Sequence, residues 1–173
     1  MAWTYFVVGS GSAGRRHSAN LQNLGKIVEH LAWRGFDAET FSSSLARCGG
    51  QAAVVIATAT DVRSELVDIC AVHNAPMYIE KPLAFTQKDV AEIYGIEIGL
   101  QQRSMVGFML RYHPLTMFLS RFDSGEFFRL QFEIGHDVRL WRENWSFSES
   151  YAARAEGGGV LLDLCHEIDL ACM

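Results

Sequence analysis

Two short segments of the chain carry side chains that can move protons or hold negative charge. Glu80 and Lys81 directly follow a short apolar run, and Asp163 and His166 stand three residues apart in the glycine-initiated segment 157–170. Residues three apart lie on the same side of a helix, so the carboxylate of Asp163 could orient the imidazole of His166 and share its proton. The ammonium group of Lys81 could stabilise a developing negative oxygen. The sequence therefore contains the parts of a proton-transfer site, divided between two distant segments.

The segment around His166 also has a simpler interpretation. At about 100° per residue, its apolar residues cover one arc of a helix, while Asp163, His166, Glu167 and Asp169 lie on the other side. This pattern predicts an amphipathic helix and by itself favours an acidic face exposed to water. A metal site formed by the first three polar residues lacks supporting ligand spacing elsewhere, so we expect no metal. The three glycines at the start favour a backbone that approaches a ligand, because each costs roughly 0.5–1 kcal/mol in regular structure.

A glycine-rich turn near the N-terminus indicates a second function, the binding of a nucleotide. The sequence G-S-G-S-A-G at residues 9–14 stands between a predicted strand and a predicted helix. In this context Gly9 permits a tight turn, Gly11 lets the backbone approach a pyrophosphate, and Gly14 lets helix and strand pack closely. The first N–H groups of the helix would then face the phosphates. The motif alone is weak, since some methyltransferases share it, but its position predicts dinucleotide binding.

The residue that follows the second predicted strand bears on the choice between NAD and NADP. An acidic residue at this position binds the ribose 2′-hydroxyl of NAD, whereas an arginine suits the 2′-phosphate of NADP. Arg34 stands there and favours NADP, although a solvated arginine would look the same. Asp37 would reverse the preference if the strand ended later.

Strands and helices alternate through the first hundred residues. Strands are expected at 5–8, 27–33, 52–57 and 75–79, and helices at 15–24, 61–72 and about 86–98, with weaker helical character at 39–47. Such alternation predicts βαβ units and a parallel sheet. The fold class is therefore α/β, with an N-terminal Rossmann-type doubly wound parallel sheet.

The pattern changes after about residue 100. A strand-like run at 105–110, a short helix from Pro114 and an extended run at 126–134 follow. We therefore expect a dinucleotide-binding domain at 1–104. Residues 105–173 would be the beginning of an α/β (α+β) substrate domain with an open sheet.

Composition limits the remaining functional classes. The chain has 173 residues, a net charge of −5 and a pI near 5.6, which argues against binding to nucleic acid or to anionic membranes. No apolar run approaches the roughly 18 residues of a membrane span, and the apolar N-terminal run lacks the basic leader of a secretory signal. The four cysteines form no C-x-x-C pair. Reduced thiols in a cytoplasmic protein that acts on a small molecule are expected.

Taken together, the motifs resemble those of the glucose–fructose oxidoreductase and inositol dehydrogenase family, Gfo/Idh/MocA. The resemblance rests on G-S-G-S-A-G (9–14), A-V-V-I-A-T (53–58), E-K-P-L (80–83), V-G-F-M-L-R-Y-H-P (106–114) and G-G-G-V-L-L-D-L-C-H (157–166). They occur in the order typical of the family and span almost the whole chain. The family consists of NAD(P)-dependent oxidoreductases that act mostly on sugars, cyclitols and sugar derivatives.

The resemblance implies a catalytic group and a cofactor site. Lys81 would lie beside the nicotinamide and the substrate hydroxyl, His166 would be the general base, and Asp163 would orient it. The X-Pro bond at Pro82 would hold the preceding backbone extended and is predicted to be cis. The expected cofactor-binding residues are Gly9, Ser10, Gly11, Ser12, Ala13, Gly14, Arg34, Ala57, Thr58, Glu80 and Lys81.

Substrate contacts are less defined by the sequence. Arg111, Tyr112, His113 and Tyr151 could line a substrate pocket, and each could equally serve packing or an interface. The resemblance also makes the second-domain sheet a candidate surface for homo-oligomerisation.

Two features depart from the pattern of the family. Only two residues separate Asp163 from His166, whereas many relatives have three, and the sequence ends at Met173, where the second domain of relatives continues. The alternative hypothesis is therefore a truncated, inactive remnant that still binds a dinucleotide. Such a remnant would expose an apolar edge at Phe127, Phe128, Leu130 and Phe132.

Overall fold

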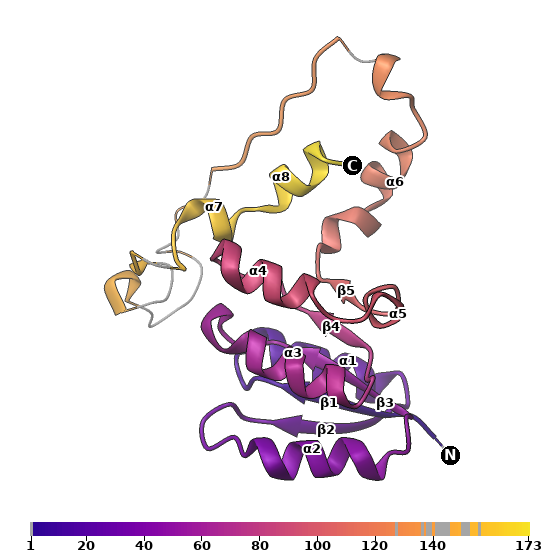
Figure 1. Ribbon diagram of the computed structural model, residues 1–173. Coiled ribbons are helices and arrows are strands. Elements are labelled where there is room, and N and C mark those ends of the chain that lie inside the picture. Colours follow the sequence, from indigo (N-terminus) through magenta and orange to yellow (C-terminus); the bar gives the residue numbers. More distant parts are fainter. Residues whose placement is uncertain are drawn as a thin grey trace. The chain divides into compact units, whose positions relative to one another are not determined.

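The first part of the chain forms a parallel sheet of apolar strands that are connected by helices (Figure 1). The computed structural model describes residues 2–126, 128–135, 137, 140, 146–149, 153–155 and 157–173. The chain divides into two compact units, Met1–Gly107 and Phe108–Met173.

The sheet of the first unit has five strands within the described residues, in the order β2-β1-β3-β4-β5, all parallel. The strands are β1 (Thr4–Val8), β2 (Ile27–Leu31), β3 (Ala52–Ile56), β4 (Met77–Ile79) and β5 (Met105–Val106). In register, Val8 pairs with Leu31 on one side and with Ile56 on the other. β1 and β3 are apolar because they are central strands covered on both faces.

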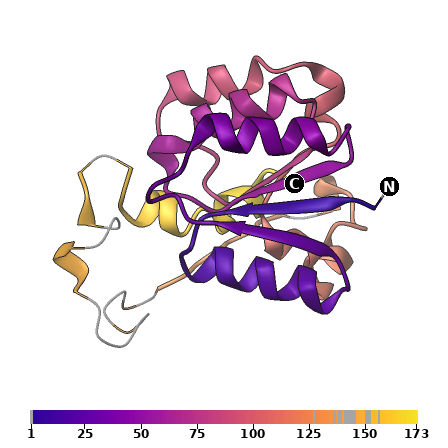
Figure 2. The ribbon, with the colours of Figure 1, turned by 90° about the horizontal axis from the view of Figure 1, so that it is seen from below.

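Helices cover the sheet in the arrangement expected of right-handed crossovers (Figure 2). Helix α1 (Ser12–Asn23) lies on one face, and α2 (Ala38–Arg47), α3 (Arg63–Val72) and α4 (Gln87–Tyr94) lie on the other. A 3₁₀ turn, η1 (Thr60–Val62), precedes α3, and the short helix α5 (Ile98–Gln101) precedes β5. The predicted Rossmann-type sheet is thus confirmed.

The hydrophobic core lies between the sheet and the layer of α2, α3 and α4. Phe6 and Ile56 of the sheet pack there with Phe41 and Leu45 of α2 and with Leu66 of α3. The weak helical character predicted for residues 39–47 therefore becomes a full helix, because tertiary packing of two apolar side chains outweighs a low intrinsic propensity.

Helix α3 follows η1, and Val62 occupies its N-cap. One local prediction in the first unit was wrong. The strand-like run predicted at 105–110 is a strand only at Met105–Val106, and β5 pairs with β4. Met105 and Val106 therefore belong to the first compact unit, which ends at Gly107.

The second unit contains short helices in its described residues. These are η2 (Met109–Tyr112), α6 (Pro114–Leu119), η3 (Ser124–Glu126), η5 (Phe147–Glu149), α7 (Val160–Asp163) and α8 (His166–Ala171). Of the run predicted to be extended at 126–134, Glu126 belongs to η3, and no described residue of this unit belongs to a sheet. An extended run becomes a strand only beside another strand, and the described part of the unit supplies none. None of the described helices is long and apolar enough to span a bilayer.

Candidate functional site

The glycine turn connects β1 to α1 and packs tightly at two of its three glycines. Gly9 has φ +123°, and a Cβ atom there would lie 2.4 Å from the carbonyl oxygen of Ala57. A Cβ atom on Gly14 would lie 1.7 Å from the carbonyl oxygen of Gly9. Only glycine fits at these positions, as the sequence predicted for a tight turn and close helix packing.

Gly11 differs from the other two glycines because nothing in the protein crowds it. It is the N-cap of α1, its side-chain position is open with no atom within 4 Å, and no side chain caps the helix. A helix N-terminus with open space in front of its backbone is suited to a phosphate group. The residues present therefore fit the pyrophosphate of a dinucleotide.

His30 supports the turn from the neighbouring strand β2. Its Nε2 lies 3.0 Å from the carbonyl oxygen of Gly9, which can only accept, so Nε2 carries the hydrogen. The sequence did not predict this contact. His30 is exposed and stands one residue before the end of β2, and its partner became visible only with the strand register.

The carboxyl end of β3 contributes Ala57 and Thr58. The amide of Ala57 donates to the carbonyl of Val8 at 2.8 Å, which places it beside the glycine turn. The Oγ1 atom of Thr58 is buried and has no hydrogen-bond partner in the described part of the chain. A buried hydroxyl without a partner is costly, and a bound ligand would supply one.

The segment after β4 is held by Arg63, a residue that the sequence analysis did not single out. Its guanidinium donates to three backbone carbonyls, those of Thr58 at 2.8 Å, Glu80 and Pro82, and Arg63 is 3% exposed. Burial lowers the pKa of Arg63 to about 10, against the opposing charges of Glu80 and Asp61, and the group stays protonated at neutral pH. Arg63 thus ties the ends of β3 and β4 together around Lys81.

The Lys81–Pro82 peptide bond is cis, as predicted. Lys81 is half-buried and stands two residues after the end of β4, at the carboxyl edge of the sheet, where ligands of doubly wound folds bind. The position confirms the expectation that the E-K-P motif stands at the end of a strand.

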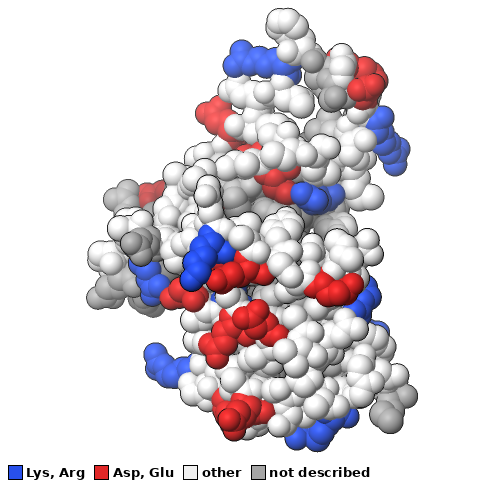
Figure 3. Space-filling view, viewed as in Figure 1, with Lys and Arg blue, Asp and Glu red and all other residues white. Residues whose placement is uncertain are grey.

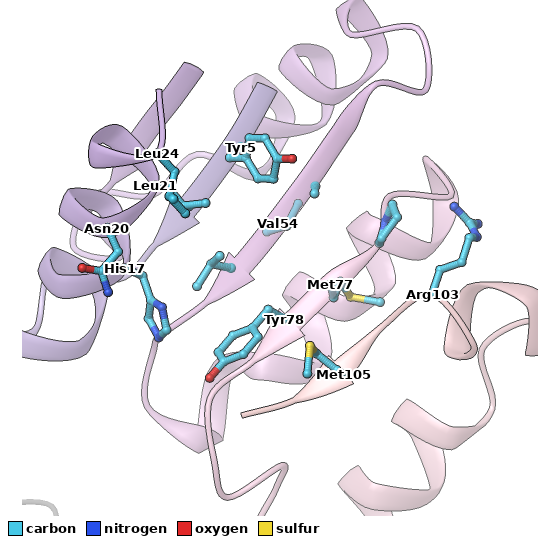
Figure 4. A pocket seen from close by; sticks show the side chains of 13 residues that line it. Tyr5, His17, Asn20, Leu21, Leu24, Val54, Met77, Tyr78, Arg103 and Met105 are labelled. Carbon is cyan, nitrogen blue, oxygen red and sulfur yellow. The ribbon is translucent and has the colours of Figure 1, made fainter. Parts of the chain in front are cut away.

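The side chain of Glu80 contacts α1. Its Oε1 lies 2.6 Å from Nε2 of His17, and the ring of His17 packs against Tyr78 with centroids 4.9 Å apart (Figure 4). Burial would raise the pKa of Glu80, but the hydrogen bond and charge of His17, with the charges of Arg16 and Arg63, outweigh it and lower the pKa. The carboxylate is therefore ionised and oriented by α1.

Arg34 and Asp37 follow β2, which ends at Leu31. Arg34 is exposed. The carboxylate of Asp37 caps α2, accepting from the amide of Glu39 at 3.1 Å and from the hydroxyl of Thr40. The Thr40 hydrogen bond is the main reason why the pKa of Asp37 is lowered. The carboxylate of Asp37 is therefore engaged as the cap of α2. Arg34 is the more accessible group after β2 for contact with a ribose substituent.

In the second unit, the predicted single helix at 157–170 is interrupted. Helix α7 ends at Asp163, α8 begins at His166, and the backbone between them leaves helical geometry at Leu164. The predicted exposure was also wrong: Asp163, His166 and Asp169 are buried, whereas Val160 is 71% exposed. The break rotates α8 relative to α7. The assignment of residues to an apolar and a polar face, which assumed one continuous helix, therefore does not hold.

Asp169 is buried in an ion pair with Arg111. The guanidinium of Arg111 donates from Nε at 2.8 Å and from Nη2 at 2.5 Å to the two carboxylate oxygens. Arg111 also lies over the ring of Phe108, 5.6 Å from its centroid, and Phe108 meets the ring of His166 edge to face. This cluster, Phe108, Arg111, His166 and Asp169, joins η2 to α8.

The other predicted substrate residues have separate positions. Tyr112 is exposed, and Nδ1 of His113 accepts the amide of Leu115 as the cap of α6. Tyr151 lies outside the described residues. Lys81 belongs to the first unit, and Asp163 and His166 belong to the second. Within the described ranges, no three His, Cys, Asp or Glu side chains are placed to hold a metal ion.

A cavity of about 330 Å³ opens on the α1 side of the sheet, apart from the glycine turn (Figure 4). Tyr5, Leu21, Tyr78 and Met105 are among the side chains that line it, and the lining is mostly apolar. On the face shown in Figure 3, basic side chains occur among acidic ones rather than in one basic patch.

Solved structures share this fold. The WlbA (WbpB) dehydrogenase from Thermus thermophilus, in complex with NAD and UDP-GlcNAcA, is 19% identical, with a TM-score of 0.69 over 99% of this chain and 62% of that one. A Gfo/Idh/MocA family oxidoreductase from Vibrio cholerae is 21% identical, with a TM-score of 0.51 over 69% of this chain and 43% of that one. A probable dehydrogenase from Thermotoga maritima is 21% identical, with a TM-score of 0.52 over 68% and 40%.

These matches confirm at the level of fold the resemblance to Gfo/Idh/MocA oxidoreductases. No protein-family model matches the sequence, and no curated protein matches it. The chain spans between 40% and 62% of the length of the three structures described above.

Proposed function

We propose that the chain is an oxidoreductase that binds NAD(P) at the carboxyl ends of the strands of its first unit. The reaction would transfer a hydride between the nicotinamide and a hydroxyl-bearing carbon of a sugar, cyclitol or sugar derivative. The observation that carries the proposal is the open backbone at Gly11, in a turn whose other two glycines are closed by packing. Two further features favour a cofactor site at the carboxyl edge of the sheet. The buried hydroxyl of Thr58 has no hydrogen-bond partner in the described part of the chain, and Lys81 stands just after β4.

The two parts of the chain would have different tasks. We assign dinucleotide binding to the first unit, Met1–Gly107, and substrate binding to the second, Phe108–Met173. The fold likeness to WlbA over 99% of the chain supports the assignment. Arg34 favours NADP over NAD, because Asp37 is occupied as a helix cap. The free thiols among the described cysteines favour a cytoplasmic location.

The chemistry requires groups that handle a proton and a negative oxygen. When bound, the nicotinamide supplies the acceptor for the hydride of the carbinol carbon, so that the alcohol becomes a carbonyl. We propose that His166 takes the hydroxyl proton, that Lys81 stabilises the charge on the same oxygen, and that Asp163 orients His166. Of the predicted substrate residues, Arg111 would act through its three remaining N–H donors, since two of its five are bonded to Asp169.

Nucleotide titration with matched variants tests the proposal. NADPH and NADH are titrated into the full chain, Gly11→Ala and Gly125→Ala, with binding read from nucleotide fluorescence. The methyl group at Gly11 would occupy the space needed by the pyrophosphate, so we expect affinity to fall about tenfold or more while the fold is kept. Gly125 is an exposed glycine of the second unit, and its variant should bind like the parent chain.

Turnover is then measured with a panel of polyols and sugar derivatives. His166→Ala should bind NADPH like the parent chain and lose about 10²–10⁴ in rate. Equal loss of binding and turnover would contradict the role of His166. Failure of the parent chain to bind either nucleotide would overturn the proposed function itself.

A second candidate, a catalytically inactive dinucleotide-binding remnant, is favoured by one observation. Phe128, Leu130 and Phe132, the described part of the apolar edge expected of such a remnant, are all exposed. Nucleotide binding without turnover on any substrate of the panel would identify the remnant.

A further inference from the structure

The guanidinium of Arg63 contacts the backbone on both sides of Lys81. Its Nη1 donates to the carbonyl oxygen of Glu80 at 2.5 Å and to that of Pro82, the residues before and after Lys81. Its Nη2 donates to the carbonyl oxygen of Thr58, two residues after the end of β3, at 2.8 Å. A guanidinium is planar and presents its N–H groups in a fixed geometry. The backbone that flanks Lys81 is therefore fixed relative to the end of β3.

These contacts begin where the hydrogen bonds of the sheet end. Strand β4 ends at Ile79, and the amide of Glu80 donates to the carbonyl oxygen of Ile56 at 2.9 Å. Residues 81–83 form a bend outside regular secondary structure. In such a segment, side chains or water must bind the backbone carbonyl groups. Arg63 does so for two carbonyl groups of the segment.

Stability alone does not explain an arginine at this position. Arg63 is 3% exposed, and burial of a charged group is costly. It is also the first residue of α3, where the helix dipole disfavours a cation. Its Nε has no hydrogen-bond partner among the described residues, which adds to the cost. Such unfavourable features are expected where the geometry of a residue serves a function.

We propose that Arg63 is a positioning residue for hydride transfer, and that it acts by holding the backbone that carries Lys81. This inference rests on the function proposed above. A group that stabilises developing charge must be placed accurately, and a displacement of about 1 Å can lower a rate about 10²-fold. Arg63 itself contacts neither nucleotide nor substrate in this role, because its guanidinium is buried and bonded to the backbone.

Arg63→Lys tests this role, because lysine keeps the charge but replaces the planar guanidinium by a single nitrogen. On a substrate that the parent chain turns over, kcat should fall about 10²-fold. NADPH affinity should stay within about threefold, since the hydrogen bonds of Arg63 go to other segments than the glycine turn. Arg47→Lys, at an exposed arginine of α2 that donates to Ser44, is the matched control and should leave both quantities unchanged.

A double-mutant cycle distinguishes action through Lys81 from a general loss of stability. Residues that act as a unit have effects that do not add. In a Lys81→Ala background, Arg63→Lys should therefore lower kcat by less than about threefold. A further loss of about 10²-fold in that background would show that Arg63 acts independently of Lys81 and would overturn the proposal.

NMR of the chain without nucleotide gives a second measure that does not depend on activity. The backbone amides of Lys81 and Leu83 should have order parameters near 0.85 in the parent chain and in Arg47→Lys, and below about 0.6 in Arg63→Lys. In the parent chain, the Nη–H protons of Arg63 should give separate, slowly exchanging signals, because they are buried and hydrogen-bonded. Those of exposed Arg47 should exchange rapidly.

Two NMR results would contradict the role of Arg63. These are unchanged order parameters in a folded Arg63→Lys variant and rapidly exchanging Arg63 signals in the parent chain. The second result needs the parent chain alone, so it decides the matter even if Arg63→Lys does not fold. Rigid amides at Lys81 and Leu83 in a parent chain that binds no nucleotide would instead refute the proposed function, so the two failures are distinguishable.

Discussion

At the end of β4, the ionised carboxylate of Glu80 connects the strand to α1 through His17. The contact is short, 2.6 Å, and both side chains are largely shielded from water. A charge-assisted hydrogen bond in such a place contributes more than a neutral one, and its loss leaves a buried partner unsatisfied. Because Lys81 is the next residue, this bond also holds the backbone that carries the ammonium group.

Replacement of Glu80 by glutamine should destabilise the first unit by roughly 1–2 kcal/mol at pH 7, because it removes the charge but keeps the shape. The pKa of Glu80 in the folded chain is below its ordinary value of 4.5. The stabilisation from the ionised carboxylate is therefore present above pH 4.5 and is lost as the pH falls through the folded-state pKa. Urea unfolding of the parent chain and of Glu80→Gln should be measured from pH 7 to pH 3. The difference between their free energies of unfolding should become smaller as the pH falls.

Glu92→Gln is the matched control for this measurement. Glu92 makes an exposed contact with Lys88 one helical turn away, and such pairs contribute less than about 0.5 kcal/mol. If Glu80→Gln were no more destabilising than Glu92→Gln at pH 7, the His17 contact would have no measurable part in stability.

The residues at the turn were predictable from sequence to different degrees. Gly9 and Gly14 follow from the steric needs of a strand–turn–helix unit, which local sequence encodes. His17 and Arg63 were missed, because their partners lie 63 residues away for His17 and 17 and 19 away for Arg63. Arg63 stands one turn before buried Leu66 on the same helix, and this position is the signal that marks it as buried.

At the scale of elements, the ion pair between Arg111 and Asp169 fixes α8 against η2. Asp169 is buried, and the hydrogen bond from Arg111 is the main cause that raises the pKa of the arginine. His166 begins the same short helix, three residues earlier. The pair therefore positions the proposed base by holding the helix on which it stands.

Arg111→Lys should loosen α8, since a lysine cannot donate two hydrogen bonds in the planar geometry of a guanidinium. We expect the backbone amides of α8 to exchange with solvent about tenfold faster, because a hydrogen bond to a charged group contributes roughly 1.5–3 kcal/mol. Hydrogen exchange read by NMR measures this effect. The exposed Arg121→Lys is the control, and equal exchange in both variants would show that the pair does not hold the helix.

The elements themselves were predictable where local pattern and burial agree. Apolar runs located β1 and β3 almost to the residue, and capping by Thr86 set the start of α4 within one residue of the prediction. The break between α7 and α8 was not predictable, because a periodicity argument assumes one continuous helix. With the break, Asp163 and His166 face inward instead of toward water.

At the scale of the whole molecule, hydrophobic burial is concentrated in the first unit. Phe6, Ile56, Leu66 and Leu100 are fully buried there, while large apolar side chains of α6, among other described residues of the second unit, are exposed. Burial of apolar surface is the main source of stability. The first unit should therefore remain folded under conditions in which the second unit has lost its structure.

The cysteines report this difference in stability directly, because they are distributed over both units. Burial raises the pKa of Cys70 to about 12, so its thiol is both inaccessible and unreactive in the folded first unit, whereas Cys172 is exposed in the second. With Ellman's reagent at pH 8, Cys172 should react at once, half-buried Cys165 at low urea, and Cys70 only in the main unfolding transition. Variants with single Cys→Ser changes assign each phase. Reaction of Cys165 and Cys70 in one common transition would show instead that the two units unfold together.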